Sequence, residues 1–90
     1  MLRDYVIDVT PVQKESKYPT VRFVTTDKTA SEPVGGGEIT VRALRYSLRL
    51  EKLLRTDELA QIEQYLDQHI AFTIFLAIDE EKMKEARLID

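Results

Sequence analysis

The sequence contains no cysteine and no tryptophan, and it has a single histidine, His69. Without cysteine there is neither a disulfide framework nor a thiolate metal site, so we expect a reducing, cytoplasmic compartment. Nucleophilic catalysis needs an activated side chain beside an oriented base, and the spacing of His69 from the serines assembles no triad. We therefore expect a binding protein rather than an enzyme, with no cofactor and no metal.

Long apolar runs are also missing. The longest apolar-rich stretch, 70–78, is far too short to span a bilayer. Asp4 and Asp8 fall where a secretory signal would need an uninterrupted apolar core. These absences predict no membrane association and no export, and the length of 90 residues predicts a single domain covering 1–90.

Charge is mild overall but uneven along the chain. The net charge is −3, yet residues 41–55 hold five basic side chains and one acidic one, a local charge of +4. From Thr56 onward the chain contains nine acidic and three basic residues, a local charge of −6. A basic segment therefore lies beside an acidic one, which points to interaction with an anion or to pairing within the chain.

Five segments have clear patterns. Residues 5–10 and 70–78 alternate with period two, and 20–26 are rich in β-branched and aromatic residues, so all three predict strands. The segment 70–78 is nearly apolar on both faces, so we expect it in the centre of the sheet. Residues 57–68 predict a helix after the capping residue Thr56. Residues 27–37 contain Pro33 and all three glycines, and they predict a flexible loop.

Two segments are ambiguous. In 41–54 the leucines and Tyr46 alternate with arginines, which favours a strand with a buried Tyr46, although the residue types favour a helix. As a helix, its apolar face would include Ala43, Tyr46 and Leu50. We take the strand as the working prediction. Residues 79–90 fit either a hairpin return or a helix, with propensity on the side of the helix.

The resulting order of strand, strand, strand, helix and strand is that of the OB-fold, a small Greek-key barrel. Its helix, with Leu59, Ala60, Ile62, Tyr65 and Leu66, resembles that of the OB-fold single-stranded-DNA-binding proteins. The tryptophans that usually stack on bases in that family are missing here. We expect a mainly β fold, an OB-like antiparallel barrel or curved sheet with one helix (about 57–68) between strands 3 and 4, with an α+β fold as the alternative.

The resemblance implies a ligand face on strands two and three and on the adjoining loops, and the basic segment adds its own cations. Together they nominate eight binding residues: Lys14, Lys17, Tyr18, Arg22, Arg42, Arg45, Arg49 and Lys52. One hypothesis is a single-stranded nucleic-acid-binding module that uses an arginine row and a few aromatic rings. The other is an adaptor or inhibitor that docks on an acidic protein partner, with a homodimer through the basic segment as a variant.

Each feature also has a structural explanation. Asp57, Glu58, Glu63 and Asp67 on the adjacent helix would neutralise the arginines without any partner. Phe75 fits either an exposed stacking ring or a core ring beneath a helix. His69, at a helix end, is better explained as a structural residue than as a ligand.

Overall fold

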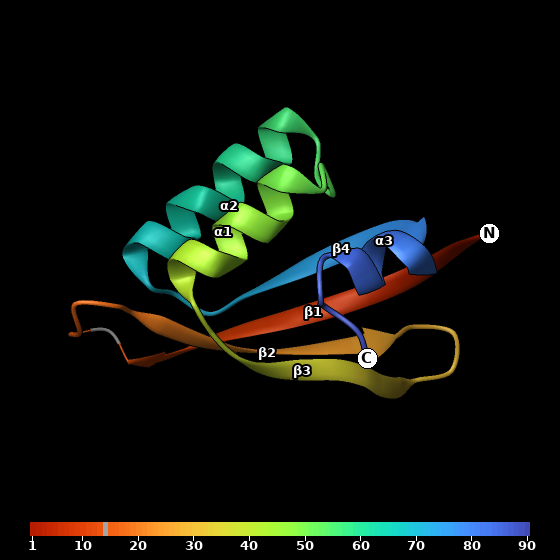
Figure 1. Cartoon of the computed structure of the whole chain (residues 1–90), viewed down its shortest axis with the longest axis horizontal. Helices are drawn as coiled ribbons and strands as arrows, with labels where there is room; N and C mark the ends of the chain where they lie inside the picture. The colour runs from red at the N-terminus through yellow and green to blue at the C-terminus, as the bar shows by residue number, and fades with distance from the viewer. Residues whose placement is uncertain (14) are drawn as a thin grey trace.

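The computed structural model describes residues 1–13 and 15–90, so the predicted binding residue Lys14 lies outside the described residues. The chain folds into a four-stranded antiparallel sheet with helices on one face (Figure 1). The elements are β1 (Leu2–Gln13), β2 (Thr20–Asp27), β3 (Glu32–Thr40), α1 (Val41–Leu50), α2 (Thr56–Gln68), β4 (Phe72–Asp79) and α3 (Glu80–Glu85). The strand order is β3-β2-β1-β4. This is the α+β fold that we gave as the alternative to a mainly β one, and its sheet is not closed into a barrel. The single helix expected between strands 3 and 4 is wrong, because both α1 and α2 lie between β3 and β4.

Period-two alternation explains β1, β2 and β4. Tyr5, Ile7 and Val9 are buried on one face of β1, and Ile74 and Leu76 continue that face in β4. Ile7 lies opposite both Thr25 and Ile74, and the β1–β4 register is regular, whereas the β1–β2 register shifts between Pro11 and Gln13. The three predicted strands are therefore confirmed, but the central position expected for β4 is wrong: β4 is an edge strand.

The predicted loop 27–37 is mostly a strand. Only residues 28–31 form a turn, and β3 begins at Glu32. Pro33 and three glycines are tolerated there because β3 is an edge strand, where a missing amide donor or side chain does little harm. Pairing with β2 over the whole length of β3, from Thr40 opposite Thr20 to Glu32 opposite Asp27, outweighs the weak local propensity.

The segment 41–54 is not a strand, because α1 occupies Val41–Leu50. Thr40 caps its first turn, accepting a hydrogen bond from the Ala43 amide at 3.1 Å. Val41, Leu44 and Leu48 form the buried stripe at helical spacing. The helical face that we considered in the sequence is also wrong, since Tyr46 and Leu50 are 66% and 58% exposed.

The helices α1, α2 and α3 end in the same way. Lys52, His69 and Arg87 adopt the left-handed conformation, with φ of 54°, 53° and 60°. In each case the next amide donates to the carbonyl five residues back, as Leu53 does to Leu48, Ile70 to Tyr65 and Leu88 to Met83. This is the Schellman arrangement, which normally uses glycine at the left-handed position. The last segment thus takes the helical alternative over 80–85, followed by an irregular end.

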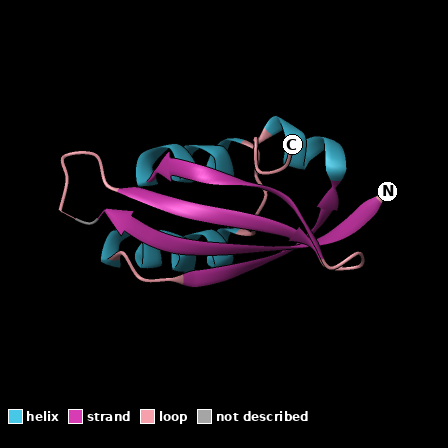
Figure 2. Cartoon of the chain, turned by 90° about the horizontal axis from the view of Figure 1, so that it is seen from below, coloured by secondary structure: helices cyan, strands magenta, loops and turns pink. Residues whose placement is uncertain are grey.

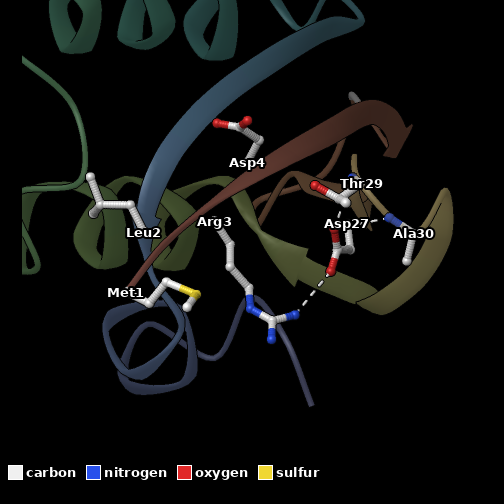
Figure 3. A pocket seen from close by; sticks show the side chains of 7 residues that line it. All are labelled: Met1, Leu2, Arg3, Asp4, Asp27, Thr29 and Ala30. Atoms are coloured by element: carbon white, nitrogen blue, oxygen red, sulfur yellow. Dashed lines mark hydrogen bonds and ion pairs between the residues drawn. The ribbon is translucent and has the colours of Figure 1, made fainter.

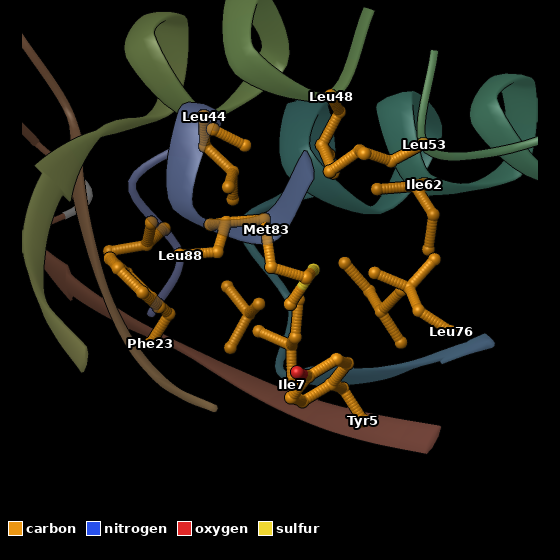
Figure 4. Packing of buried hydrophobic residues seen from close by; sticks show 14 of the residues in the cluster. Tyr5, Ile7, Phe23, Leu44, Leu48, Leu53, Ile62, Leu76, Met83 and Leu88 are labelled. Carbon is orange, nitrogen blue, oxygen red and sulfur yellow. The ribbon is translucent and has the colours of Figure 1, made fainter. Parts of the chain in front are cut away.

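The core lies between the sheet and the helices. Met83 from α3 is fully buried between the helical leucines and the sheet residues Tyr5 and Ile7 (Figure 4). Figure 2 looks onto the opposite face of the sheet, and the helices lie behind the strands. That face carries half-buried Val6 and partly exposed Val24, and it leaves Phe75 66% exposed, so Phe75 is not a core ring beneath a helix. None of the helices in the described part of the chain is long and apolar enough to cross a membrane.

Candidate partner-binding surface on α1

Two of the predicted binding residues are already paired within the fold. Arg45 forms an ion pair with Asp67 and also donates to the carbonyl oxygen of Glu63. Arg49 forms an ion pair with the carboxylate of Glu63. Because both acids lie on α2, the two helices neutralise each other along their line of contact. The arginine row expected on a strand does not form.

The other predicted residues are dispersed. Arg22 stands on the uncovered sheet face, where Glu38 binds it at 2.5 Å. Lys17 and Tyr18 lie in the β1–β2 turn, and the Lys17 amine sits 5.8 Å from the Tyr18 ring centre. Lys52 holds the left-handed position after α1. The fold therefore brings Arg42, Arg45 and Arg49 together on α1 and leaves the rest apart.

A hollow of about 460 Å³ opens between α1 and the end of α3. Its wall includes the apolar side chains of Ile39, Ala43 and Ala86. Arg42, Tyr46 and Arg87 also line it. Apolar surface next to two guanidinium groups suits a ligand that is both apolar and anionic.

A second hollow of about 230 Å³ lies on the other side of Tyr46. Arg42, Arg45, Tyr46 and Arg49 line it. Since Arg42 and Tyr46 belong to both hollows, the two form one continuous surface. We call this the α1 surface and define it by Arg42, Ala43, Tyr46, Arg49 and Arg87.

The cations of the α1 surface differ in how far they are neutralised. Within the described residues, neither Arg42 nor Arg87 has an ion-pair partner within 4 Å, in contrast to Arg45 and Arg49. Arg87 also occupies a backbone conformation that costs about 1–2 kcal/mol for an L-residue. That conformation belongs to the Schellman end of α3, and Arg87 lines the hollow from there.

A hollow of about 350 Å³ beside the β2–β3 turn has a structural explanation. There the buried carboxylate of Asp27 accepts hydrogen bonds from the amides of Thr29, at 2.9 Å, and Ala30, at 3.3 Å (Figure 3). Arg3 donates to its second oxygen at 3.3 Å. Asp27 thereby organises the β2–β3 turn, and both of its oxygens are already engaged.

Sequence reasoning missed Tyr46 and Arg87 as surface residues. A signal was present for Tyr46: α1 carries more apolar residues than one buried stripe needs, so some had to face solvent. For Arg87 the sequence holds no comparable signal, because its position beside α1 depends on how the end of the chain folds back.

Comparison with protein-family models, with curated proteins and with solved structures finds no match to this chain in any of the three.

Proposed function

We propose that the protein is a non-enzymatic interaction module that binds an acidic, partly apolar segment of a partner protein on the α1 surface. The observation that carries this proposal is the hollow in which Arg42, Tyr46 and Arg87 surround apolar side chains. Tyrosine and arginine are the residue types that most often dominate the energy of protein interfaces. The two unpaired guanidinium groups supply the attraction for carboxylates.

The charge distribution supports a protein partner over a nucleic acid. A phosphate backbone is bound by a row of available cations, and here Arg45 and Arg49 are held by Asp67 and Glu63. The exposed ring of Phe75 lies on the uncovered sheet face, close to Asp8, which is hydrogen-bonded to Thr73 at 2.9 Å. An acidic neighbourhood repels phosphates, so the ring and the arginines do not combine into one nucleic-acid site.

The test is a fluorescence-anisotropy titration with two probes. One is a labelled peptide of alternating glutamate and leucine, and the other is labelled oligothymidine of equal charge. We expect the peptide to bind more tightly, with an affinity that falls as salt rises. The double variant Arg42→Gln and Arg87→Gln should weaken peptide binding about tenfold, equivalent to ~1.4 kcal/mol.

The matched control replaces Arg22 and Lys28 by glutamine. This pair removes the same charge from the uncovered sheet face and the β2–β3 turn, so it should leave peptide binding within a factor of about two. If both double variants weaken binding equally, only net charge matters and the α1 surface is not the site. If oligothymidine binds more tightly than the peptide and Arg42→Gln with Arg87→Gln reduces that binding, the nucleic-acid function replaces this one.

A further inference from the structure

The outer edge of β4 carries none of the features that usually prevent strand pairing. Its sequence from Phe72 to Ile78 is F-T-I-F-L-A-I, with no charge, no proline and no glycine. It pairs regularly with β1 from Leu2 opposite Asp79 to Val9 opposite Phe72, without a bulge. A regular, uncharged edge strand leaves a row of unpaired backbone donors and acceptors that another strand can use.

The opposite edge of the same sheet is protected in three ways. Pro33 removes one amide donor from β3. The register between β3 and β2 also shifts, between Thr25 and Thr26 of β2. The Asp90 amide also occupies the Val34 carbonyl at 3.0 Å. Because one edge is protected and the other is not, the open edge of β4 is a specific feature and not a general property of this sheet.

A shallow hollow of about 220 Å³ runs beside the β4 edge, under α2. The carboxylate of Glu58, the one charged group lining it, is bound by Arg55 at 3.0 Å, and Gln61 donates to the Tyr65 hydroxyl at 2.8 Å. These polar groups are satisfied inside the chain, so the hollow suits an uncharged strand better than an acidic or basic one. In the described part of the chain, β4 is the strand that is both uncharged from Phe72 to Ile78 and open at its edge. A second copy of β4 therefore meets the requirement for a partner strand.

We propose that two copies of the chain associate through β4, antiparallel and edge to edge, to form one continuous eight-stranded sheet. In such a sheet, the residues that lie opposite each other in the two β4 strands must point to the same face. A two-fold axis at Phe75 meets that requirement. It places Phe75 opposite its own copy and Thr73 opposite Ala77, all on the uncovered face. Antiparallel pairing of identical segments is self-complementary, and an aromatic pair at the axis adds to its stability.

The helices are compatible with this arrangement. In one copy α1, α2 and α3 all lie on the same face of the sheet (Figure 1). A two-fold axis perpendicular to the sheet keeps the helices of both copies on that face, so the face that carries Phe75 stays uncovered in the pair. Since the β3 edges are protected, growth stops at two copies. The α1 surface takes no part, so this proposal is independent of the proposed function.

The first test is the molar mass of the full chain in solution, by light scattering at about 100 µM. We expect twice the 10.4 kDa of one chain. Phe75→Lys places like charges opposite each other and should give the mass of one chain. Tyr46→Lys is the matched control, because Tyr46 is equally exposed, at 66%, and lies on α1. It should remain dimeric. A monomeric parent chain overturns the proposal, as does a Phe75→Lys variant that folds and stays dimeric.

The second test uses the absence of cysteine in the chain and keeps the register falsifiable even if Phe75→Lys does not fold. An equimolar mixture of Thr73→Cys and Ala77→Cys chains should cross-link on oxidation into a mixed disulfide dimer, since these positions lie opposite each other. Each variant alone should cross-link at least tenfold less. Equal cross-linking in all three samples, or none in the mixture, rules out the β4 pairing.

Discussion

Gly35 lies directly against the backbone of Ile89. A Cβ atom at Gly35 would stand 2.5 Å from the Cα of Ile89 and 2.6 Å from the carbonyl oxygen of Leu88. Both contacts are with main-chain atoms, which cannot rotate away as a side chain can. The glycine therefore lets residues 88–90 pack over the end of the sheet.

We predict that Gly35→Ala lowers the free energy of unfolding by about 1–3 kcal/mol, the usual cost of overpacking. Urea denaturation measures this directly. The same substitution in a chain truncated after Arg87 should cost little, because the obstructing backbone is gone. An equal loss in both backgrounds would mean that another contact is responsible.

The residues with left-handed backbone conformation at the helix ends give a second prediction. Lys52→Gly and His69→Gly should each raise the free energy of unfolding by about 0.5–1 kcal/mol. Glycine relieves a strain of about 1–2 kcal/mol but gives the unfolded chain more freedom. The control is Ala60→Gly at an exposed position inside α2, which should lose about 1 kcal/mol. If the cap variants lose stability as Ala60→Gly does, the side chains at the caps stabilise the fold in another way.

The ion pairs between α1 and α2 give a third prediction. Replacing Glu63 by Gln and Asp67 by Asn removes both partners of Arg45 and Arg49. We expect a loss of about 0.2–1 kcal/mol per pair, reduced in 1 M salt by screening.

The same variant should bind oligothymidine measurably more tightly than the parent chain, because two guanidinium groups become available. The control is Glu81→Gln with Glu85→Gln in α3, which changes the net charge equally. If the control raises oligothymidine affinity by the same factor, net charge alone governs binding and the pairing is irrelevant to it.

Tyr5 gives a prediction about alkaline pH. Burial raises the pKa of the Tyr5 hydroxyl above 10.0, and the nearby carboxylates of Glu80 and Asp27 act in the same direction, against Arg3. The unfolded chain then loses this proton at a lower pH than the folded chain. The stabilisation is fully present below about pH 10 and is lost as the pH rises through the pKa of the folded state.

Urea midpoints at pH 9 and pH 11 check this, with Tyr5→Phe as the comparison. We expect the parent chain to lose more stability between the two pH values than Tyr5→Phe, which has no proton at this position to lose. Equal losses would show that other groups cause the alkaline destabilisation.

Local patterns predicted part of the fold well. The strands at 5–10, 20–26 and 70–78 and the helix at 57–68 follow from alternation and helical spacing, because each element buries one face. The failure at 41–50 has a physical cause: the leucines of α1 fit both periods over this short stretch. The capping hydroxyl of Thr40 and the Schellman end at Lys52 favour the helix.

The strand β3 and the α1 surface could not be predicted in the same way. Pro33 and the glycine run argue against a strand locally, and β3 forms only because β2 offers a full set of partners. The hollow beside Tyr46 depends on Arg87, 41 positions further along the sequence, being folded back against α1. Long-range packing of this kind leaves no periodic signal in the sequence.

The position of β1 between β2 and β4 has a consequence for how fast the protein folds. β1, β2 and β3 form a meander, and α1 and α2 a helical hairpin, so both units can form from neighbours in sequence. The contact from Thr73 to Asp8, by contrast, joins residues 65 positions apart. Closing that loop costs entropy before any pairing energy is gained. Docking of β4 on β1 should therefore set the folding rate, and substitutions along this pair of strands should slow refolding more than substitutions in α1.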